Sequence, residues 1–345
     1  VKHAFVFDGG MKAVINAIRP DIIIKGKEHQ ELENIEQDFL AEYGGKLVFG
    51  SGEAVFSSLD LIREESIRRK SSPFDLKVQH KYLERHGIKK DRLYEILDKF
   101  SDISVLVVGD LIVDEYITCD VLGLSQEDPI VVVTPVLEQK FIGGAGIVAS
   151  HAKGLGAQAT YLSVCGDDSE YHDSMAKFEN YGVTAKIFKD PNRPTTLKQR
   201  FRASGKTLFR VSKLKQHAIE TALQNKIFEY FESKISEFDL VIFSDFNYGV
   251  LPQNLIDRLT ELCKKLNIPM VADSQSSSQK GNIARFKDML LITPTENEAR
   301  IALQDYEDGL VGVADALMKK SNPKQILLTL GAEGVLIQKG SYSED

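Results

Sequence analysis

Apolar positions in the chain fall into short runs separated by segments of helical period. From about Ser101 onward, strands are predicted at Val105–Val108, Ala159–Val164, Leu240–Ser244, Met270–Asp273, Met289–Ile292, Ile326–Thr329 and Gly334–Ile337. Intervening segments such as Gln224–Phe238 and Gln253–Leu266 repeat apolar residues with the period of an amphipathic helix. This alternation predicts a doubly wound α/β fold with a mostly parallel sheet, whose ligands bind beyond the carboxyl ends of the strands.

One β-rich stretch interrupts this rhythm. Pro129–Pro135 and Val136–Ile142 are both β-rich, and no helical segment lies between them. They predict a small antiparallel flap inserted after the first strand of the sheet.

The first seventy residues show a second, shorter alternation. Strands are predicted at Phe5–Phe7, Asp21–Lys25 and Lys46–Phe49, with a helix at Met11–Ile18. The spacing Ser57-x-x-Asp60 is that of a capping box at a helix start. Such a sequence predicts part of a parallel, Rossmann-like sheet with crossover helices.

A charged stretch separates the two alternating regions. Within residues 71–100, short amphipathic helices are predicted at His80–His86 and Asp91–Phe100. We therefore expect a partial domain over 1–70, a helical linker over 71–100 and a larger domain over 101–345 whose carboxyl-terminal part is missing.

Composition narrows the classes of function. The 345 residues are 43% hydrophobic and 27% charged, with a net charge of −7, which argues against nucleic acid or an anionic membrane as the main partner. No apolar run is long enough to span a bilayer, and no signal-peptide pattern is present. The three cysteines are far apart and form no metal-binding spacing, so reduced, buried thiols in a cytoplasmic protein are expected.

Glycines and carboxylates follow the first strand of the larger domain. The loop Gly143-Gly144-Ala145-Gly146 precedes a helix, where backbone N–H groups can approach a ligand or simply form a tight turn. Asp110 and Asp114 are placed at the carboxyl end of a central strand. They suit sugar hydroxyls, although Asp110 could equally cap a helix.

Polar clusters also follow later strands. Ser244-Asp245, Asp273 and the run Thr293–Glu298 end three successive predicted strands, and Thr329-Leu-Gly331-Ala-Glu-Gly334 joins the last two. Each alone could be a turn, a helix cap or an ordinary hairpin. Lys198, Arg200 and Arg202 alternate along a predicted strand, so they form either a basic row facing an anionic substrate or a solvated strand face.

Together these motifs resemble the ribokinase-type (PfkB-like) carbohydrate kinases, particularly the heptose-phosphate kinase branch of ADP-heptose synthesis. The resemblance covers about Val105 to Ile337. The motifs that carry it are Gly109-Asp110 with Asp114, Gly143-Gly144-Ala145-Gly146, Thr196-x-Lys198-x-Arg200, Ser244-Asp245-x-x-x-Gly249, Asp273, Pro294-x-x-x-Glu298 and Thr329-x-Gly331-x-x-Gly334.

The resemblance implies a role for each motif. Sugar binding is assigned to Asp110, Asp114, Gly143, Gly144, Lys198 and Arg200. ATP binding is assigned to Asp245, Asp273, Glu298, Thr329, Gly331 and Gly334. Glu298 would act on Mg²⁺ through water, and the β-flap would build a homodimer.

The chain departs from the family pattern at four points. Ile147 and Thr295 each stand where the family has Asn, and Tyr248 stands where it often has Lys. The Gly-Ala-Gly-Asp motif with the catalytic base is expected beyond Asp345, so the catalytic residue is unknown and this segment alone is expected to be inactive. These departures leave the sugar undetermined.

The first region resembles the second half of a cytidylyltransferase-like nucleotidyltransferase. The run Arg19–Gly26 matches that family's strand ending in Lys-Gly, and Phe56-Ser57-Ser58 matches its helix start. The resemblance implies phosphate binding by Lys25, Ser57 and Ser58. Its His-x-Gly-His motif would lie upstream of Val1.

The sequence thus predicts ATP-dependent phosphorylation of a sugar or sugar phosphate, coupled to nucleotidyl transfer in nucleotide-sugar synthesis. Two alternatives stay open. The same fold could act on another sugar or on a nucleoside, or it could be a non-catalytic module for dimerisation or regulation.

Overall fold

The computed structural model of the chain describes residues 11–26, 34–50, 83–128, 130–275 and 281–340. The chain divides into two units, 1–88 and 89–345, and each is described here by itself. The predicted strand Phe5–Phe7 and the helix start at Ser57–Asp60 lie outside the described residues. Among the described helices, none has both the length and the apolar character needed to cross a bilayer.

In the first unit, two parallel strands pair beside two helices. The elements are α1 (Met11–Ile18), β1 (Ile22–Gly26), α2 (Glu36–Ala41) and β2 (Lys46–Gly50). β1 pairs with β2 in parallel, as the alternation predicts. Ile15 of α1 and Leu40 of α2 are buried, while Ile22, Ile24 and Val48 on the strands are exposed. Among the described residues of this unit, the buried apolar side chains thus come from the helices.

In the second unit, the main sheet has eight strands in the order β14-β13-β12-β11-β10-β3-β6-β7. All neighbours pair in parallel except β13 with β14. The strands are β3 (Ser104–Gly109), β6 (Gln158–Cys165), β7 (Thr184–Lys189), β10 (Leu240–Asp245), β11 (Met270–Ser274), β12 (Leu291–Ile292), β13 (Gln325–Thr329) and β14 (Val335–Lys339).

Helices precede or connect these strands. They are α5 (Lys90–Asp98), α6 (Gly144–Gly154), α7 (Ser169–Tyr181), α8 (Thr221–Lys234), α9 (Gln253–Lys265), α10 (Glu296–Leu303) and α11 (Leu310–Ser321). Short 3₁₀ turns occur at Lys99–Asp102, Ile235–Glu237, Ile283–Arg285 and Gly331–Glu333. The predicted helix Gln253–Leu266 is thus found as α9, and the predicted helix Asp91–Phe100 is found as α5 followed by a 3₁₀ turn.

The central strand β3 is buried on both faces, because its alternate residues enter two separate apolar clusters. Val105 and Val107 pack with Ala145, Ala149 and other residues of the α6 and α7 side. Leu106 and Val108 belong to the larger cluster on the α8 and α9 side. This explains why β3 is a continuous apolar run in the sequence.

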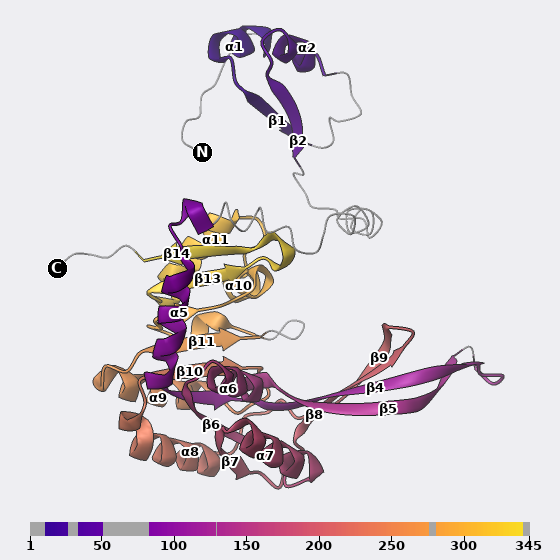
Figure 1. Cartoon of the computed structure of the whole chain (residues 1–345), viewed down its shortest axis with the longest axis vertical. Coiled ribbons are helices and arrows are strands. Elements are labelled where there is room, and N and C mark those ends of the chain that lie inside the picture. Colours follow the sequence, from indigo (N-terminus) through magenta and orange to yellow (C-terminus); the bar gives the residue numbers. More distant parts are fainter. Residues whose placement is uncertain (1–10, 27–33, 51–82, 129, 276–280, 341–345) are drawn as a thin grey trace. The chain divides into compact units, whose positions relative to one another are not determined.

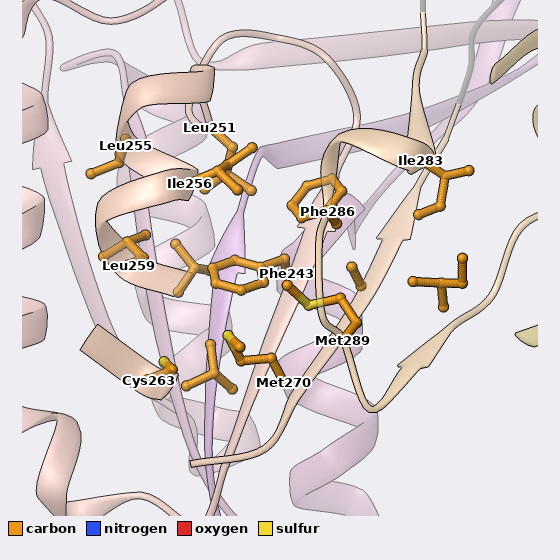
Figure 2. Close-up of a cluster of buried hydrophobic side chains, with 14 of the residues drawn as sticks. Phe243, Leu251, Leu255, Ile256, Leu259, Cys263, Met270, Ile283, Phe286 and Met289 are labelled. Carbon is orange, nitrogen blue, oxygen red and sulfur yellow. The ribbon is translucent and has the colours of Figure 1, made fainter. Parts of the chain in front are cut away.

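The larger cluster is centred on β10. Figure 2 shows Phe243 between the α9 side chains Leu255 and Leu259 on one side and Phe286 on the other. The two phenyl rings stack with 5.7 Å between their centroids. Because these side chains are nearly inaccessible to solvent, they fix the end of β10 relative to the helix that follows it.

β3 and β10 approach so closely at their carboxyl ends that no side chain fits there. A Cβ atom at Gly109 would lie 1.8 Å from the Ser244 carbonyl oxygen and 2.8 Å from Ala145 Cβ. Glycine is therefore required at this position by space. The contact brings the residues after both strands together.

The flap is a separate four-stranded sheet in the order β5-β4-β8-β9. Its strands are β4 (Leu111–Leu124), β5 (Val131–Gly143), β8 (Thr196–Ala203) and β9 (Lys206–Lys213). The long β4–β5 hairpin projects away from the main sheet (Figure 1).

Two details of the predicted flap are wrong. Residues 131–143 form one strand that pairs with β4, rather than two strands that pair with each other. Pro135 lies opposite Cys119, next to an irregularity in the register, and β5 is an edge strand. Proline is tolerated at bulges and edges, so here it does not end the strand. Asp114 lies inside β4, not at the carboxyl end of a central strand.

Candidate functional site

The carboxylate of Asp110 lies directly after β3 and is 1% exposed. Its Oδ2 accepts hydrogen bonds from the N–H groups of Phe246, at 2.8 Å, and Tyr248, at 3.4 Å. Its Oδ1 accepts one from the N–H of Val250, at 3.3 Å. The side chain therefore holds the loop that follows β10, which is a different role from the helix cap that the sequence left open.

The same loop is held from its other side by a buried arginine. Arg193 donates from Nη1 to the Tyr248 carbonyl, at 2.9 Å, and from Nη2 to the His217 carbonyl, at 3.0 Å. Its Nε donates to Asp190 at 2.8 Å, and both side chains of this ion pair are almost fully buried. With all three nitrogens engaged, Arg193 ties the segment before β8 to the loop after β10.

Asp245, at the end of β10, is also buried, and its carboxylate is paired. Its Oδ2 accepts from Arg285 Nη2 at 2.6 Å and from Ser274 Oγ at 3.0 Å. Its Oδ1 accepts from the N–H of Asn247 at 3.0 Å. The partner Arg285 belongs to a 3₁₀ turn before β12.

Asp273 continues this row of carboxylates at the end of β11. Its Oδ1 accepts from Thr293 Oγ1 at 3.0 Å. Burial, with smaller contributions from the charges of Glu298 and Asp245, raises the pKa of Asp273 to about 6. Burial and the charge of Asp245 likewise raise the pKa of Asp110 to about 6, although its three N–H donors act in the opposite direction.

Glu298 lies in the first turn of α10, where it completes a capping box. Its carboxylate accepts from the N–H of Thr295 at 2.8 Å, and Thr295 Oγ1 accepts from the N–H of Glu298 at 3.2 Å. Thr295 therefore caps the helix with its side chain. The capping fixes Glu298 near Asp273, at the carboxyl ends of β11 and β12.

The loop after β13 lies next to this helix start. Thr329 forms a β-bridge with Thr295, and its N–H donates to the Pro294 carbonyl at 2.9 Å. Gly331 and Gly334 both have positive φ angles, of 61° and 109°, which glycine adopts without strain. All six residues assigned to ATP binding thus lie at or beyond the carboxyl ends of the neighbouring strands β10 to β13.

Five of the six residues assigned to sugar binding come from the flap and the start of α6, and the sixth, Asp110, is the buried residue directly after β3. Arg200 of β8 forms an ion pair with Asp114 of β4. Gly143 lies against the same carboxylate, because a Cβ atom there would be 2.3 Å from Asp114 Oδ2. Lys198 lies over the rings of Phe246 and Tyr248, with its Nζ 5.5 Å and 5.1 Å from their centroids.

The glycine loop is held by Asp110 as well. Gly144 has a φ of 58°, and a Cβ atom there would lie 2.4 Å from the Asp110 carbonyl oxygen. The same oxygen accepts from the N–H of Ala145 at 2.9 Å. These backbone contacts with Asp110 therefore fix the glycine loop at the amino-terminal end of α6.

Among the residues that the structure describes, no group of three His, Cys, Asp or Glu side chains could hold a metal ion directly. The Glu298 carboxylate is partly used in the capping box. The charges of Glu298 and Asp245 both act on Asp273, and the Asp245 carboxylate is paired with Arg285. Contact with Mg²⁺ through water, as predicted for Glu298, is compatible with this arrangement and stays a prediction.

The structure thus gathers the predicted residues into two groups, and it adds two arginines that sequence reasoning missed. Arg193 and Arg285 pair with Asp190 and Asp245, but each lies in an irregular segment where no periodic pattern marks it. In the first unit, Lys25 Nζ lies 3.0 Å from Glu36 Oε1. Ser57 and Ser58 lie outside the described residues.

Comparison with known proteins matches most of the second unit to a family of carbohydrate kinases. A sequence model described as "pfkB family carbohydrate kinase" matches residues 102–343. The chain is 30% identical over 250 residues to "Bifunctional protein HldE" of Trichlorobacter lovleyi, covering 71% of this chain and 50% of that protein. It is 32% identical over 238 residues to the protein of the same name in Nitratiruptor, covering 68% and 49%. The chain spans about half the length of these curated relatives.

Solved structures share the fold at lower identity. The phosphofructokinase-2 of Escherichia coli in complex with fructose-6-phosphate superposes with a TM-score of 0.55 at 14% identity, covering 70% of this chain and 78% of that chain. The ribokinase of Arabidopsis thaliana complexed with ribose and ATP gives a TM-score of 0.51 at 16% identity, covering 70% and 76%. At this identity the similarity establishes the ribokinase-like α/β fold alone.

The raised pKa of Asp273 predicts a pH-dependent stability. Its folded-state pKa of about 6 lies above the ordinary value of 3.8. The stability that it contributes is full below about pH 3.8 and is lost as the pH rises through about 6. Asp273→Asn keeps an acceptor for Thr293 but cannot ionise. Between pH 4 and pH 7 the variant should lose less free energy of unfolding than the wild type, by on the order of 1–2 kcal/mol in urea titrations.

Asp305→Asn provides the control. Hydrogen bonds from the N–H groups of Asp308 and Glu307 lower the pKa of Asp305, so its contribution to stability is lost as the pH falls, in the opposite direction. Equal pH slopes for Asp273→Asn and the wild type would contradict the assignment.

Proposed function

Because this chain belongs to the pfkB family of carbohydrate kinases, we propose that its second unit transfers the γ-phosphoryl group of ATP to a hydroxyl of a sugar phosphate resembling a heptose phosphate. Two observations support the choice of substrate. The curated relatives named above are HldE proteins at about 30% identity. In addition, the flap carries cations beside Asp114.

The proposed division of labour follows the two groups of residues. On the flap side, Asp114 accepts hydrogen bonds from sugar hydroxyls, while Lys198 and Arg200 bind the anionic group of the substrate. On the other side, ATP lies along the edge formed by Asp273, Glu298 and the Thr329–Gly334 loop, with Mg²⁺ held through water. Catalysis at such a site consists mainly of positioning and charge stabilisation.

The contact between Lys198 and Tyr248 supports the proposed role of Lys198. Tyr248 is a position at which the chain departs from the family pattern. Where related kinases often have Lys, Tyr248 presents a ring, and Lys198 from β8 lies over it. We infer that Lys198 supplies a positive charge near the position that the family's lysine would occupy.

The proposed kinase function predicts that phosphoryl transfer depends on the charged carboxylate of Asp114. The full-length protein should transfer phosphate from ATP to a heptose phosphate, measured as ADP release. Asp114→Asn should lower kcat/KM about 100-fold, because a neutral amide replaces the charged acceptor of the sugar hydroxyls.

The matched control is Asp120→Asn, a change of the same kind on the exposed outer part of β4, which should leave kcat/KM within about twofold. If the full-length protein phosphorylates no sugar or sugar phosphate, the proposed function is wrong. If it prefers a nucleoside or an unphosphorylated sugar, the rival substrate class is correct.

We propose further that the first unit belongs to a cytidylyltransferase-like nucleotidyltransferase acting on the product of the kinase. The supporting observation is the parallel β1–α2–β2 arrangement with Lys25 near the carboxyl end of β1. An ammonium there can bind the phosphates of a nucleotide.

This second proposal predicts release of pyrophosphate when the full-length protein is given a nucleoside triphosphate and a sugar phosphate. Lys25→Gln should slow that release about tenfold, without changing the rate of ADP formation by the kinase. Lys46→Gln, an exposed lysine on β2 of the same unit, is the control. No pyrophosphate release from any nucleoside triphosphate would count against the proposal.

The flap is proposed to join two copies of the chain. Its outer part exposes a run of apolar side chains, each at least 49% accessible: Val121, Leu122, Leu124, Ile130, Val131, Val136 and Leu137. Exposed apolar surface of this extent is typical of an interface.

Sedimentation equilibrium of the full-length protein should therefore give twice the mass of one chain. Val136→Lys should shift the equilibrium toward one chain, because it buries a charge in the interface. Val311→Lys, which alters a similarly exposed valine on α11, should not. A single-chain mass for the wild type would contradict the flap dimer.

A further inference from the structure

Both ends of the β8–β9 hairpin lie beside the loop that follows β10. β8 begins at Thr196, shortly after Arg193. β9 ends at Lys213, shortly before His217. Arg193 donates from Nη2 to the His217 carbonyl at 3.0 Å and from Nη1 to the Tyr248 carbonyl, in the loop, at 2.9 Å. One guanidinium therefore joins the segment before the hairpin, the segment after it and the loop.

The loop also packs directly against the segment that follows β9. Gly249 has a φ of 94°, and a Cβ atom there would lie 2.1 Å from the His217 carbonyl oxygen. The Gly249 carbonyl accepts a hydrogen bond from the N–H of Ile219 at 3.0 Å. Because the two backbones approach so closely, the loop cannot shift against this segment without breaking these contacts.

The segment before β8 is anchored independently of the loop. The N–H of Thr195 donates to Asp168 Oδ2 at 2.9 Å. The N–H of Asp190 donates to the Cys165 carbonyl, at the end of β6, at 2.8 Å. Arg193 thus projects from a backbone that the main sheet and the start of α7 hold in place. We expect loss of its guanidinium to release the loop while this segment stays where it is.

Arg193 acts on the loop from a buried position. It is 7% exposed, and its ion-pair partner Asp190 is 3% exposed. Burying such a pair costs free energy unless further hydrogen bonds are made to the charged groups. The Tyr248 and His217 carbonyls supply those hydrogen bonds. Any effect of Arg193 on a bound substrate must therefore pass through these backbone partners.

Tyr248 is the residue through which such an effect would pass. Its N–H donates to Asp110 Oδ2 at 3.4 Å, and its carbonyl accepts from Arg193 at 2.9 Å. Its backbone is therefore fixed from both sides, and its ring lies 5.1 Å from Lys198 Nζ. Removing the guanidinium leaves only the longer of these two hydrogen bonds, so the ring is free to move relative to Lys198.

We propose that Arg193 is a positioning residue of the kinase: by joining the segment before β8 to the Tyr248 and His217 carbonyls, it holds the β8–β9 hairpin and the loop after β10 in the one arrangement that places Lys198 for substrate binding. Arg193 acts through the backbone and not on the substrate. This inference rests on the proposed kinase function, because it assumes that Lys198 binds the sugar phosphate.

Hydrogen exchange tests the structural half of this proposal without any need for activity. In the full-length Arg193→Gln variant, peptides that contain the amides of Phe246, Tyr248 and Val250 should exchange about tenfold faster than in the wild type, because one anchor of the loop is lost. Peptides from β10 should exchange at the wild-type rate. Unchanged exchange in the loop, or equal acceleration in β10, would overturn the proposal.

Steady-state kinetics tests the functional half. Arg193→Gln should raise KM for the sugar phosphate about tenfold and leave KM for ATP within about twofold, because only the flap side loses its geometry. A purely structural defect would instead lower kcat through loss of folded protein and leave both KM values unchanged. Arg193→Lys keeps the charge beside Asp190 without the planar fork, so it should restore part of the affinity.

A double-mutant cycle shows whether the effect passes through Lys198. In a Lys198→Gln background, Arg193→Gln should raise KM for the sugar phosphate by less than about twofold, because the side chain that it positions is already absent. Independent, multiplicative effects of the two substitutions would contradict the proposal. If Arg193→Gln does not fold, Arg193→Gln combined with Asp190→Asn replaces it, since that variant leaves no unpaired buried carboxylate.

Arg258→Gln is the matched control. Arg258 joins α9 to α8 through Asn225, at 3.0 Å, and lies over the Phe228 ring, outside the loop and the flap. Its loss should change neither KM nor the exchange of the loop. If Arg193→Gln changes KM for both substrates equally, or for neither, this inference fails and the kinase function stands. If the wild type phosphorylates no sugar phosphate, both fail.

Discussion

The backbone amides of the loop after β10 converge on the buried carboxylate of Asp110, and much of the site's geometry follows from that contact. The carboxylate accepts from three N–H groups of this loop, and the carbonyl oxygen of the same residue accepts from the start of α6. One residue thus joins the end of β3, the end of β10 and the glycine loop. Burying a carboxylate costs free energy unless hydrogen bonds are made to it. The N–H donors therefore stabilise the buried carboxylate of Asp110, and the carboxylate in turn orders the loop.

Close packing makes that arrangement possible. Gly109 lets β3 and β10 approach until only a glycine fits between them, and the buried cluster around Phe243 packs β10 against α9 (Figure 2). Arg193 then holds the outer side of the loop through the Tyr248 carbonyl. The rings of Phe246 and Tyr248 are therefore presented to Lys198 on the flap. The loop after β10 therefore contacts both Asp110 at the end of β3 and Lys198 of the flap.

The two groups of site residues differ in how their charges are balanced. At the carboxyl ends of the strands, Asp245 is paired with Arg285. Among the described residues Asp273 has no basic partner, and burial and neighbouring charge raise its pKa. On the face of the flap that carries Asp114, this carboxylate shares the face with Lys198, Arg200 and Arg210, so positive charge is in excess among these residues. An ATP site with a metal ion needs negative groups that attract the metal, and an anionic sugar needs cations. The distribution of charge therefore agrees with the proposed reaction.

Several features of the site could be predicted from sequence because they lie in regular elements. The strands from β3 to β14 are short apolar runs, so the carboxylates and glycines that follow them could be placed at one edge of a sheet. Lys198, Arg200 and Arg202 could be placed on one face because side chains alternate along a strand. The continuous β5 strand was harder to predict, because Pro135 resembles a strand end and is tolerated only through its position at a bulge in an edge strand.

By itself, the sequence determined the alternating α/β pattern, the order of the motifs and the identity of the residues at the carboxyl edge, since periodicity and spacing are local properties of the chain. The tertiary structure alone decided which charges meet. Arg200 and Asp114 are 86 residues apart, Arg285 and Asp245 are 40 apart, and Asp110 binds amides 136 to 140 residues further on. These contacts depend on strand register and on the crossing of loops between distant elements. A local sequence pattern encodes neither the strand register nor the crossing of the loops. The electrostatic energy of a charged group depends on the side chains that surround it after folding.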